Sequence, residues 1–380
     1  MSATIDTKTV MRLAGFEANA LFKAGILPLN FKGSRVSQPT APIRDISGII
    51  LFYRVPIVSL GRQIIYADIA ANPIFGSTIL AYHIGMTWNP DEITKKAEAA
   101  AREKNRDFSY DRVEFVAFSY PKIAVQFLKD DKEVALIELY TWAQVPPEDT
   151  SKERYNSRQS ILKIIPKEVQ KKNEEQFNQR VKQWSTVVQR EVNPLIIDPA
   201  TTVHWPVAKH GERVIHYSPD DATHSPCFEL AAQHTGVWCV VASTKMVLDF
   251  YRFVYTQDRI AAEEGLGTYA HPNGLPYGQE AKVVNTIEKF SSNGLDAALN
   301  MSPNWAEFRT EIEANRPLIS LIPGHARCVA GYSQTQIFPW YIIRFLRVYD
   351  PWAPGVGVIT WENFDAQTYR ATFTINPKTI

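Results

Sequence analysis

Three residues far apart in the chain have side chains that together could carry out nucleophilic catalysis: Cys239, His325 and Asp350. A thiol becomes a strong nucleophile once it loses its proton, an imidazole can accept that proton, and a carboxylate can hold the imidazole in one tautomer. Cys239 begins a stretch with helical periodicity, so its thiol should lie near unpaired backbone N–H groups and the positive end of the helix dipole, which favour the thiolate. The alternative for Cys239 is a small core residue, because free cysteines are often buried.

The segment that begins at Cys239 is predicted to be a mostly buried helix. Apolar residues cover most of its circumference as far as Val254, whereas Lys245, Asp249 and Arg252 form one narrow polar stripe at helical spacing. Lys245 and Asp249 are four residues apart and can pair along that stripe. A helix with so little polar surface is expected at the centre of a domain.

His325 and Asp350 are expected to meet across a β-hairpin. His325 opens the strand-like segment 325–332, and Asp350 ends the segment 342–350. A direct pairing of the two residues centres the turn in the non-periodic stretch 333–341, which is predicted to be a loop. Taken singly, His325 could be a structural histidine and Asp350 a turn residue before proline. Their combination with Cys239 favours catalysis.

The other cysteines and the remaining histidines suggest no metal site. By the two-residue period of a strand, Cys328 points away from His325 and is expected in the core. The three cysteines, which include Cys227, lack the spacing of a disulfide framework or a Cys-x-x-Cys zinc site. Four histidines are spaced by six, six and eight residues, which places them on no common face of a helix or strand. We therefore expect neither a metal nor another cofactor. The four are His204, His210, His216 and His224.

The charge balance argues against a nucleic-acid-binding protein. The 380 residues carry 41 basic and 40 acidic side chains, so no overall field favours nucleic acid or an anionic membrane. A hydrophobic content of 45% is typical of a folded protein. No apolar run is long enough to span a membrane, and the first residues lack a secretory signal pattern. The sequence as it stands indicates a cytoplasmic protein, or a secreted one if a signal was removed.

Proline-rich boundaries divide the chain into three predicted domains. Residues 1–145 form a β-rich domain, in which His83 is expected to be structural. Residues 146–204 contain a charged helix at 166–192 and much of a connector that extends to residue 226 through repeated X-Pro steps. Residues 205–380 contain the three candidate catalytic residues. The strands expected in the first domain are 49–58, 63–69, 78–84, 113–120, 123–128 and 134–142, and its helices are 10–22 and 90–101.

The C-terminal domain is predicted to be α+β. Helices are concentrated in its first part and strands in its last part, which is the order typical of this class. After the Cys239 helix, the expected helices are 257–264, 278–290 and 305–314. The expected strands are 318–322, 326–332, 342–349, 356–361 and 371–375.

Several short motifs around these residues resemble those of papain-like cysteine peptidases. Gln233 lies six residues before Cys239, and His325 stands in a Gly-His-Ala sequence after Gly324. Asp350 is followed two residues later by a tryptophan, Trp352. The resemblance covers about 145 residues of the C-terminal half and is closest to the compact bacterial and archaeal kind, which includes bacteriocin-leader peptidases and streptopain-like enzymes. It implies a central helix packed on an antiparallel sheet.

The resemblance also implies a role for each matching residue. Cys239 would be the nucleophile, His325 its base, and Asp350 the residue that orients the imidazole. Gln233 would donate its amide to the oxyanion together with the Cys239 backbone N–H, and Trp352 would shield the histidine–aspartate bond from water. Two further neighbours, Gly324 and Trp238, would lie at or beside the substrate. The chain lacks the Cys-Gly-x-Cys-Trp sequence of papain itself: Val240 follows the nucleophile and Trp238 precedes it. The resemblance therefore does not predict the substrate pockets.

The expected function is that of a cysteine endopeptidase made as a zymogen. The N-terminal domain would block the cleft until the connector at 193–226 is cleaved, as in many peptidase precursors. A domain that recruits a peptide or protein substrate would look the same in sequence. Two other functions remain open: acyl transfer or amide hydrolysis with the same triad, and non-catalytic binding on a peptidase fold.

Overall fold

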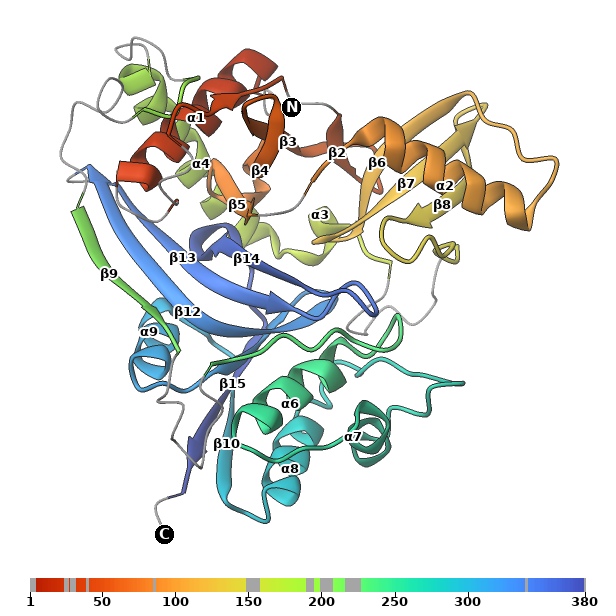
Figure 1. Cartoon of the computed structure of the whole chain (residues 1–380), viewed down its shortest axis with the longest axis vertical. Helices are drawn as coiled ribbons and strands as arrows, with labels where there is room; N and C mark the ends of the chain where they lie inside the picture. The colour runs from red at the N-terminus through yellow and green to blue at the C-terminus, as the bar shows by residue number, and fades with distance from the viewer. Residues whose placement is uncertain are drawn as a thin grey trace.

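The computed structural model describes residues 5–23, 27, 32–38, 41–84, 87–147, 158–188, 195–198, 208–215, 227–338 and 341–378. Most of the predicted connector at 193–226 lies outside these residues, as do His204, His216, His224 and the side chain of His210. The N-terminal half occupies the upper part of Figure 1, and the residues from 227 onward form most of the lower part. Within the described residues, no helix is both long and apolar enough to cross a membrane.

One sheet connects the two halves of the protein. In the described part of the chain it contains 15 strands, and it passes from the C-terminal to the N-terminal half where β14 (Val358–Asn363) meets β5 (Ile79–Ile84). These strands pair antiparallel at Trp361↔Tyr82 and Glu362↔Ala81. The two halves are therefore joined by backbone hydrogen bonds as well as by side-chain packing.

The N-terminal half is rich in strands, as predicted. Each of the six strands expected there is present, with bounds that differ by a few residues from the predicted ones. The elements are α1 (Thr7–Lys23), β1 (Arg35–Val36), β2 (Pro42–Asp45), β3 (Ile50–Ser59), β4 (Arg62–Ala70), η2 (Pro73–Phe75), β5, α2 (Pro90–Lys104), β6 (Arg112–Ser119), β7 (Lys122–Lys129), β8 (Lys132–Glu138), α3 (Ile161–Ile164) and α4 (Lys167–Val188).

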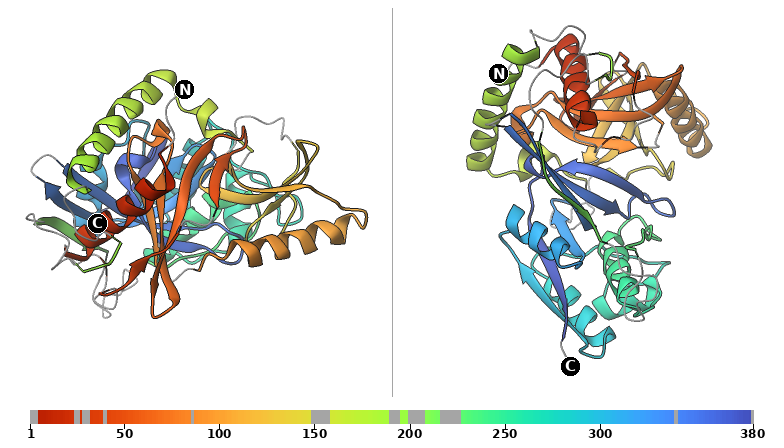
Figure 2. Two further views of the ribbon diagram at one scale, coloured as in Figure 1. Left: turned by 90° about the horizontal axis from the view of Figure 1, so that it is seen from above. Right: turned by 60° about the vertical axis from the view of Figure 1, so that its left-hand side comes forward.

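The charged helix α4 lies beside α1 on the N-terminal part of the sheet (Figure 2). Its narrow apolar stripe is buried: Phe177 and Trp184 are each 2% exposed. The Trp184 ring packs edge-on against Phe16 of α1, with a centroid distance of 4.2 Å, and its Nε1 donates to Thr78 at 3.1 Å. The prediction of a surface helix with one buried stripe is confirmed.

The helix that begins at Cys239 is the centre of the C-terminal core. Helix α6 (Cys239–Phe250) is buried along its whole length except at Lys245 and Asp249, which form an ion pair at 2.8 Å. It packs against β12 and β11 of the antiparallel sheet, so the α+β prediction is confirmed. The helix ends at Phe250, and Val254 is exposed rather than buried. The other elements are β9 (Ala208–Val214), α7 (Gln257–Glu264), α8 (Ala281–Phe290), β10 (Leu295–Asn300), α9 (Trp305–Glu313), β11 (Leu318–Ile322), β12 (His325–Phe338), β13 (Tyr341–Asp350), β14, η3 (Phe364–Ala366) and β15 (Ala371–Pro377).

The hairpin β12–β13 is longer than the sequence suggested. The stretch 333–341 was expected to be a loop, but β12 continues to Phe338. Two contacts stabilise this extension: β9 pairs with residues 331–336 of β12, and Ile343 and Phe345 of β13 are buried in the N-terminal core. Strand β9 itself lies in the segment predicted to be an extended connector. Its sequence does not alternate, so it becomes a strand through pairing with β12.

Candidate active site

Cys239 is the first residue of α6 and has no exposed surface. The preceding residue, Trp238, provides no side-chain cap, so its side chain engages none of the first backbone N–H groups of the helix. The thiol interacts with the His325 side chain and with the backbone N–H of Ala326. The structure therefore brings together two residues that are 86 positions apart in the sequence.

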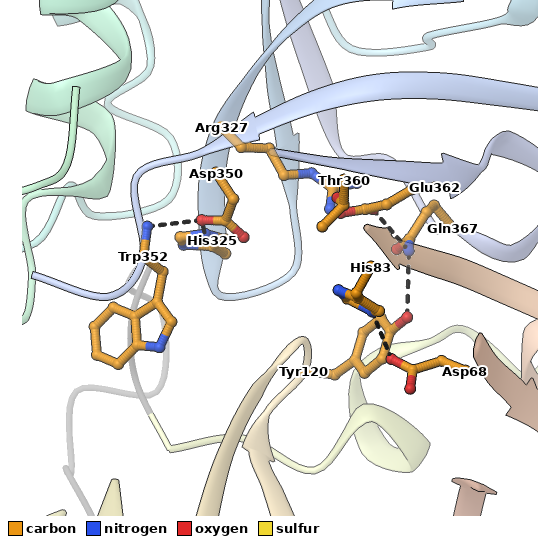
Figure 3. Close-up of polar contacts among 10 residues, drawn as sticks. All are labelled: Asp68, His83, Tyr120, His325, Arg327, Asp350, Trp352, Thr360, Glu362 and Gln367. Carbon is orange, nitrogen blue, oxygen red and sulfur yellow. Dashed lines mark hydrogen bonds and ion pairs between the residues drawn. The ribbon is translucent and has the colours of Figure 1, made fainter. Parts of the chain in front are cut away.

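His325 lies between the thiol and a carboxylate. Its Nε2 is 2.6 Å from Oδ1 of Asp350, and the same oxygen accepts the backbone N–H of Trp352 at 2.8 Å (Figure 3). The other ring nitrogen, Nδ1, is buried and makes no conventional hydrogen bond to any residue that the structure describes. Because Nε2 faces Asp350, Nδ1 is the nitrogen available to exchange a proton with Cys239.

The pairing of His325 with Asp350 differs in detail from the prediction. By the register Cys328↔Tyr349, the position directly opposite His325 is residue 352, so Asp350 lies diagonally across from His325, two residues from that position. Side chains two residues apart on a strand point to the same face, so the shift keeps both groups on one side of the sheet. The prediction that the side chains meet is correct, whereas the predicted direct register is wrong.

Electrostatic interactions within this group favour a thiolate beside an imidazolium. Burial raises the pKa of Cys239, but the interaction with His325 and the charge of Lys122 lower it below its ordinary value. Burial lowers the pKa of His325, yet the charge and hydrogen bond of Asp350 raise it overall. The pKa of Asp350 is lowered despite burial because His325 and the Trp352 N–H stabilise the carboxylate.

Gln233 is attached to the loop that follows Asp350. Its backbone N–H donates to the Pro351 carbonyl and its carbonyl accepts from Gly355, both at 3.0 Å. The side-chain Nε2 donates to the Thr235 carbonyl at 2.6 Å, and Oε1 has no hydrogen-bond partner within the described residues. The amide is therefore buried and held close to the start of α6, with one of its two N–H groups engaged.

Three further residues were expected beside the triad. The side chain of Trp352 packs with Ala353 against N-terminal residues such as Val116 and Phe118. The amide of Gly324 donates to the Tyr277 hydroxyl at 3.0 Å. In contrast, Trp238 is fully buried in the C-terminal core and donates its Nε1 to the Leu266 carbonyl at 3.1 Å, so it offers no surface to a substrate in this structure.

Lys122, which the sequence did not single out, covers the catalytic residues from the N-terminal half. It opens β7 and is 1% exposed, and its Nζ donates to the Gly324 carbonyl at 3.4 Å. Burial lowers its pKa to about 8, while the charges of Cys239 and Asp350 act in the opposite direction. No local pattern indicated this lysine, since its hydrogen-bond partner Gly324 lies 202 residues further along the chain.

A second contact between the halves lies at Gly324. A Cβ atom on this glycine would come within 2.5 Å of Ser119 Oγ, at the end of β6. Gln159, which forms a bridge with Ser119, accepts a hydrogen bond from the Tyr277 hydroxyl at 3.4 Å. Tyr277 in turn lies under the guanidinium of Arg370 at 3.8 Å. The N-terminal half thus fits closely against the residue that precedes His325.

A buried ion pair lies beside His325 on β12. Arg327, two residues further along the strand, is fully buried and donates to Glu362 of β14 at 2.5 Å (Figure 3). Its charge contributes to the lowered pKa of Asp350. A small cavity of about 50 Å³ separates Glu362 and Asp350 from His83 and Asp68 of the N-terminal half. His83, which is expected to be structural, has its Nε2 2.9 Å from Oδ2 of Asp68.

The described residues contain no group of three or more histidine, cysteine, aspartate or glutamate side chains arranged to hold a metal ion. Cys328 is a core residue, as predicted: it is fully buried and its thiol contacts the Ser243 carbonyl at 3.3 Å. Burial raises the pKa of the Cys328 thiol.

The C-terminal region is similar to a known protein family. Residues 227–375 match the model of a family described as Peptidase_C39 like. This match confirms the predicted relationship to papain-like cysteine peptidases for the part of the chain that contains Cys239, His325 and Asp350. No protein in a search of curated sequences matches the chain.

Two solved structures are similar over part of the chain. One is a double glycine motif protease from an AMS/PCAT transporter in complex with the leader peptide, at 17% identity and a TM-score of 0.27, covering 40% of this chain and 91% of that one. The other is UfSP from C. elegans, at 9% identity and a TM-score of 0.28, covering 52% of this chain and 46% of that one.

Proposed function

We propose that the protein is a cysteine endopeptidase that uses Cys239, His325 and Asp350 as its catalytic triad. The main support is the position of His325, whose Nε2 is 2.6 Å from Oδ1 of Asp350. The same ring interacts with the Cys239 thiol and lowers the pKa of that thiol. An imidazole held in this way can accept a proton on one nitrogen while the carboxylate fixes the other.

In this mechanism the Cys239 thiolate attacks the carbonyl carbon of a peptide bond. The negative charge that develops on the carbonyl oxygen would be stabilised by the Cys239 backbone N–H and by the free N–H of the Gln233 amide. The His325 imidazolium then gives its proton to the leaving amine, which departs and leaves an acyl-Cys239 intermediate. Water, deprotonated by His325, hydrolyses this thioester and regenerates the thiolate.

We propose further that the N-terminal half blocks this site. Cys239 and His325 are both 0% exposed, and Lys122 and Ser119 of the N-terminal half lie against Gly324. A peptide bond cannot reach the thiol in this arrangement, so catalysis requires the N-terminal half to move or to be removed. The division into an inhibitory domain at 1–145, a connecting segment at 146–204 and a catalytic domain at 205–380, with cleavage within 193–226, is part of this proposal.

Catalysis is tested with purified full-length protein and three variants. The protein is incubated alone and with a mixture of fluorogenic peptides, and new N-termini are sequenced. We expect cleavage by the wild type that is lost in Cys239→Ala and reduced at least 1,000-fold in His325→Ala, on the order of the loss seen when a triad member is removed. Cys328→Ala is the matched control, since it removes another buried cysteine and should retain activity.

Blockage is tested by opening the junction between the halves without removing residues. Lys122→Glu is expected to increase the rate of peptide cleavage, because a second negative charge beside Asp350 disfavours the closed arrangement. Activity that persists in Cys239→Ala contradicts the triad. Activity that is equal in wild type and the opened variant contradicts blockage and favours a recruiting role for the N-terminal half.

A further inference from the structure

A cavity of about 390 Å³ lies beside the catalytic residues, where the two halves of the protein meet. One wall is the loop 234–237, which leads into Cys239, together with Trp352 and Pro354 from the loop after Asp350. The opposite wall comes from the N-terminal half and includes Phe118, Val145 and Pro146. The cavity has a size typical of ligand sites, roughly 300–1,000 Å³, and aromatic and aliphatic groups form much of its wall.

One buried carboxylate is part of this wall. Glu138, the last residue of β8, is 3% exposed, and its Oε2 accepts hydrogen bonds from the Tyr140 N–H and from the N–H and hydroxyl of Thr141. These bonds, 2.7–3.0 Å long, fix the orientation of the side chain. The second oxygen, Oε1, is buried and has no hydrogen-bond partner among the described residues. Such an oxygen is costly to leave without a donor.

The charged groups nearby do not fill this role. Arg158 also lines the cavity, but both of its terminal nitrogens donate to Glu133, at 3.0 and 2.5 Å. Lys122 is close enough for its charge to interact with Glu138, but it does not line the cavity, and its Nζ donates to the Gly324 carbonyl. Trp352 interacts with Glu138 and lowers its pKa, yet burial outweighs this effect and raises the pKa overall. Among the described residues, no cation is therefore hydrogen-bonded to this carboxyl group, and burial still dominates its pKa.

We propose that this cavity binds the side chain of a lysine or arginine residue of a peptide. The aliphatic stem would pack against Phe118, Val145 and Trp352, and the cationic end would donate to Glu138 Oε1. The identification of that peptide as the substrate rests on the proposed peptidase function, whereas the binding itself does not. In this arrangement the N-terminal half contributes the residue that recognises the ligand, in addition to covering Cys239.

Binding is tested with small probes and full-length Cys239→Ala, in which no peptide can be cleaved. The probes are the N-acetyl methylamides of lysine, arginine and norleucine, and binding is measured by calorimetry and by saturation-transfer NMR. Norleucine has nearly the shape of lysine without the charge. We expect lysine and arginine probes to bind at least tenfold more tightly than norleucine, and Glu138→Gln to reduce lysine binding to the level of norleucine. Asp131→Asn, which neutralises an exposed acid in the turn before β8, should leave the binding of all three probes unchanged.

Equal binding of lysine and norleucine overturns the inference, and so does lysine binding that Glu138→Gln leaves unchanged. Absence of binding by every probe at millimolar concentration does the same. If Glu138→Gln does not fold, the comparison of probes on the unmodified cavity still decides, and Val145→Phe, which fills the cavity, should abolish binding of all three. Because these measurements involve no cleavage, they are unaffected if the peptidase proposal fails. An active peptidase with no probe binding would contradict this inference alone.

Discussion

The Nζ of Lys122 lies 4.8 Å from the centroid of the Trp352 ring. A residue of the N-terminal sheet is thus placed over the aromatic side chain that follows Asp350 by two positions. A cation in this position on an indole stabilises the folded protein by about 0.5–2 kcal/mol, and the upper end of this range applies when the pair is removed from water. The contact is small in energy, but it lies where the two halves of the protein cover the triad.

The first prediction concerns access to Cys239. Replacing Lys122 with glutamate puts a carboxylate near Asp350 and Glu138, and an uncompensated buried charge costs about 3–5 kcal/mol. We expect the rate of Cys239 alkylation by iodoacetamide, measured by mass spectrometry, to rise at least tenfold. Lys129→Glu, at the exposed end of the same strand, is the control and should leave the rate unchanged. Equal rates in both variants would mean that Lys122 does not hold the halves together.

The second prediction concerns the dependence of stability on pH. Burial lowers the pKa of Lys122 to about 8 in the folded protein, whereas an unfolded lysine titrates near 10.4. Between these values the unfolded state binds more protons, so the free energy of unfolding rises with pH. Relative to Lys122→Met, the wild type should gain roughly 1–3 kcal/mol between pH 8 and pH 10.4, at about 1.4 kcal/mol per pKa unit.

This gain is measured by urea denaturation of wild type and Lys122→Met at both pH values. Taking the difference between the two proteins removes the titration of groups that they share. The variant Lys129→Met controls for the loss of a lysine from the same strand. A difference between wild type and Lys122→Met that stays constant with pH would show that Lys122 is not desolvated in the folded state.

Much of the fold was predictable because local periodicity reflects which face of an element is buried. The apolar positions of α6 identified a central helix, and the predicted hairpin correctly brought the side chains of His325 and Asp350 together. Their register was not predictable, since β9 and the N-terminal core extend the hairpin beyond its own sequence pattern. Lys122 was not predictable either, because its partner Gly324 is 202 residues away.

The third prediction concerns the ion pair between Arg327 and Glu362. Both side chains are nearly inaccessible, at 0% and 8% exposure, so removing one partner leaves a buried charge unpaired. We expect Arg327→Met to lower the free energy of unfolding by about 3–5 kcal/mol, and the double variant Arg327→Met/Glu362→Gln to recover much of that loss. Chemical denaturation of the four members of this cycle measures the coupling.

The matched control for this cycle is an ion pair on the surface. Arg309 and Glu313 pair at 2.8 Å on α9 with 48% and 43% of their side chains exposed. Their coupling should be about 0.3–0.5 kcal/mol, as for other exposed pairs four residues apart on a helix. If the buried and exposed cycles give the same coupling, then the interior beside His325 is as well solvated as the surface.

The last prediction concerns the fit of Gly324 against the N-terminal half. Gly324 has a φ of +74°, and an added Cβ would lie 2.5 Å from Ser119 Oγ. Gly324→Ala should therefore combine backbone strain of about 1–2 kcal/mol with a steric clash between the halves. Gly61→Ala isolates the strain, because that glycine has a φ of +76° with no atom within 4 Å of its Cβ position.

We expect Gly324→Ala to lower the free energy of unfolding more than Gly61→Ala does, and to speed alkylation of Cys239. Ser119→Ala/Gly324→Ala removes the close contact, since the nearest remaining atoms lie 3.8 and 3.9 Å from the new Cβ. This double variant should return to the level of Gly61→Ala in stability and to the slow alkylation of the wild type. If Ser119→Ala fails to restore slow alkylation, the effect of Gly324→Ala comes from the backbone around His325, and the contact with Ser119 does not keep the site closed.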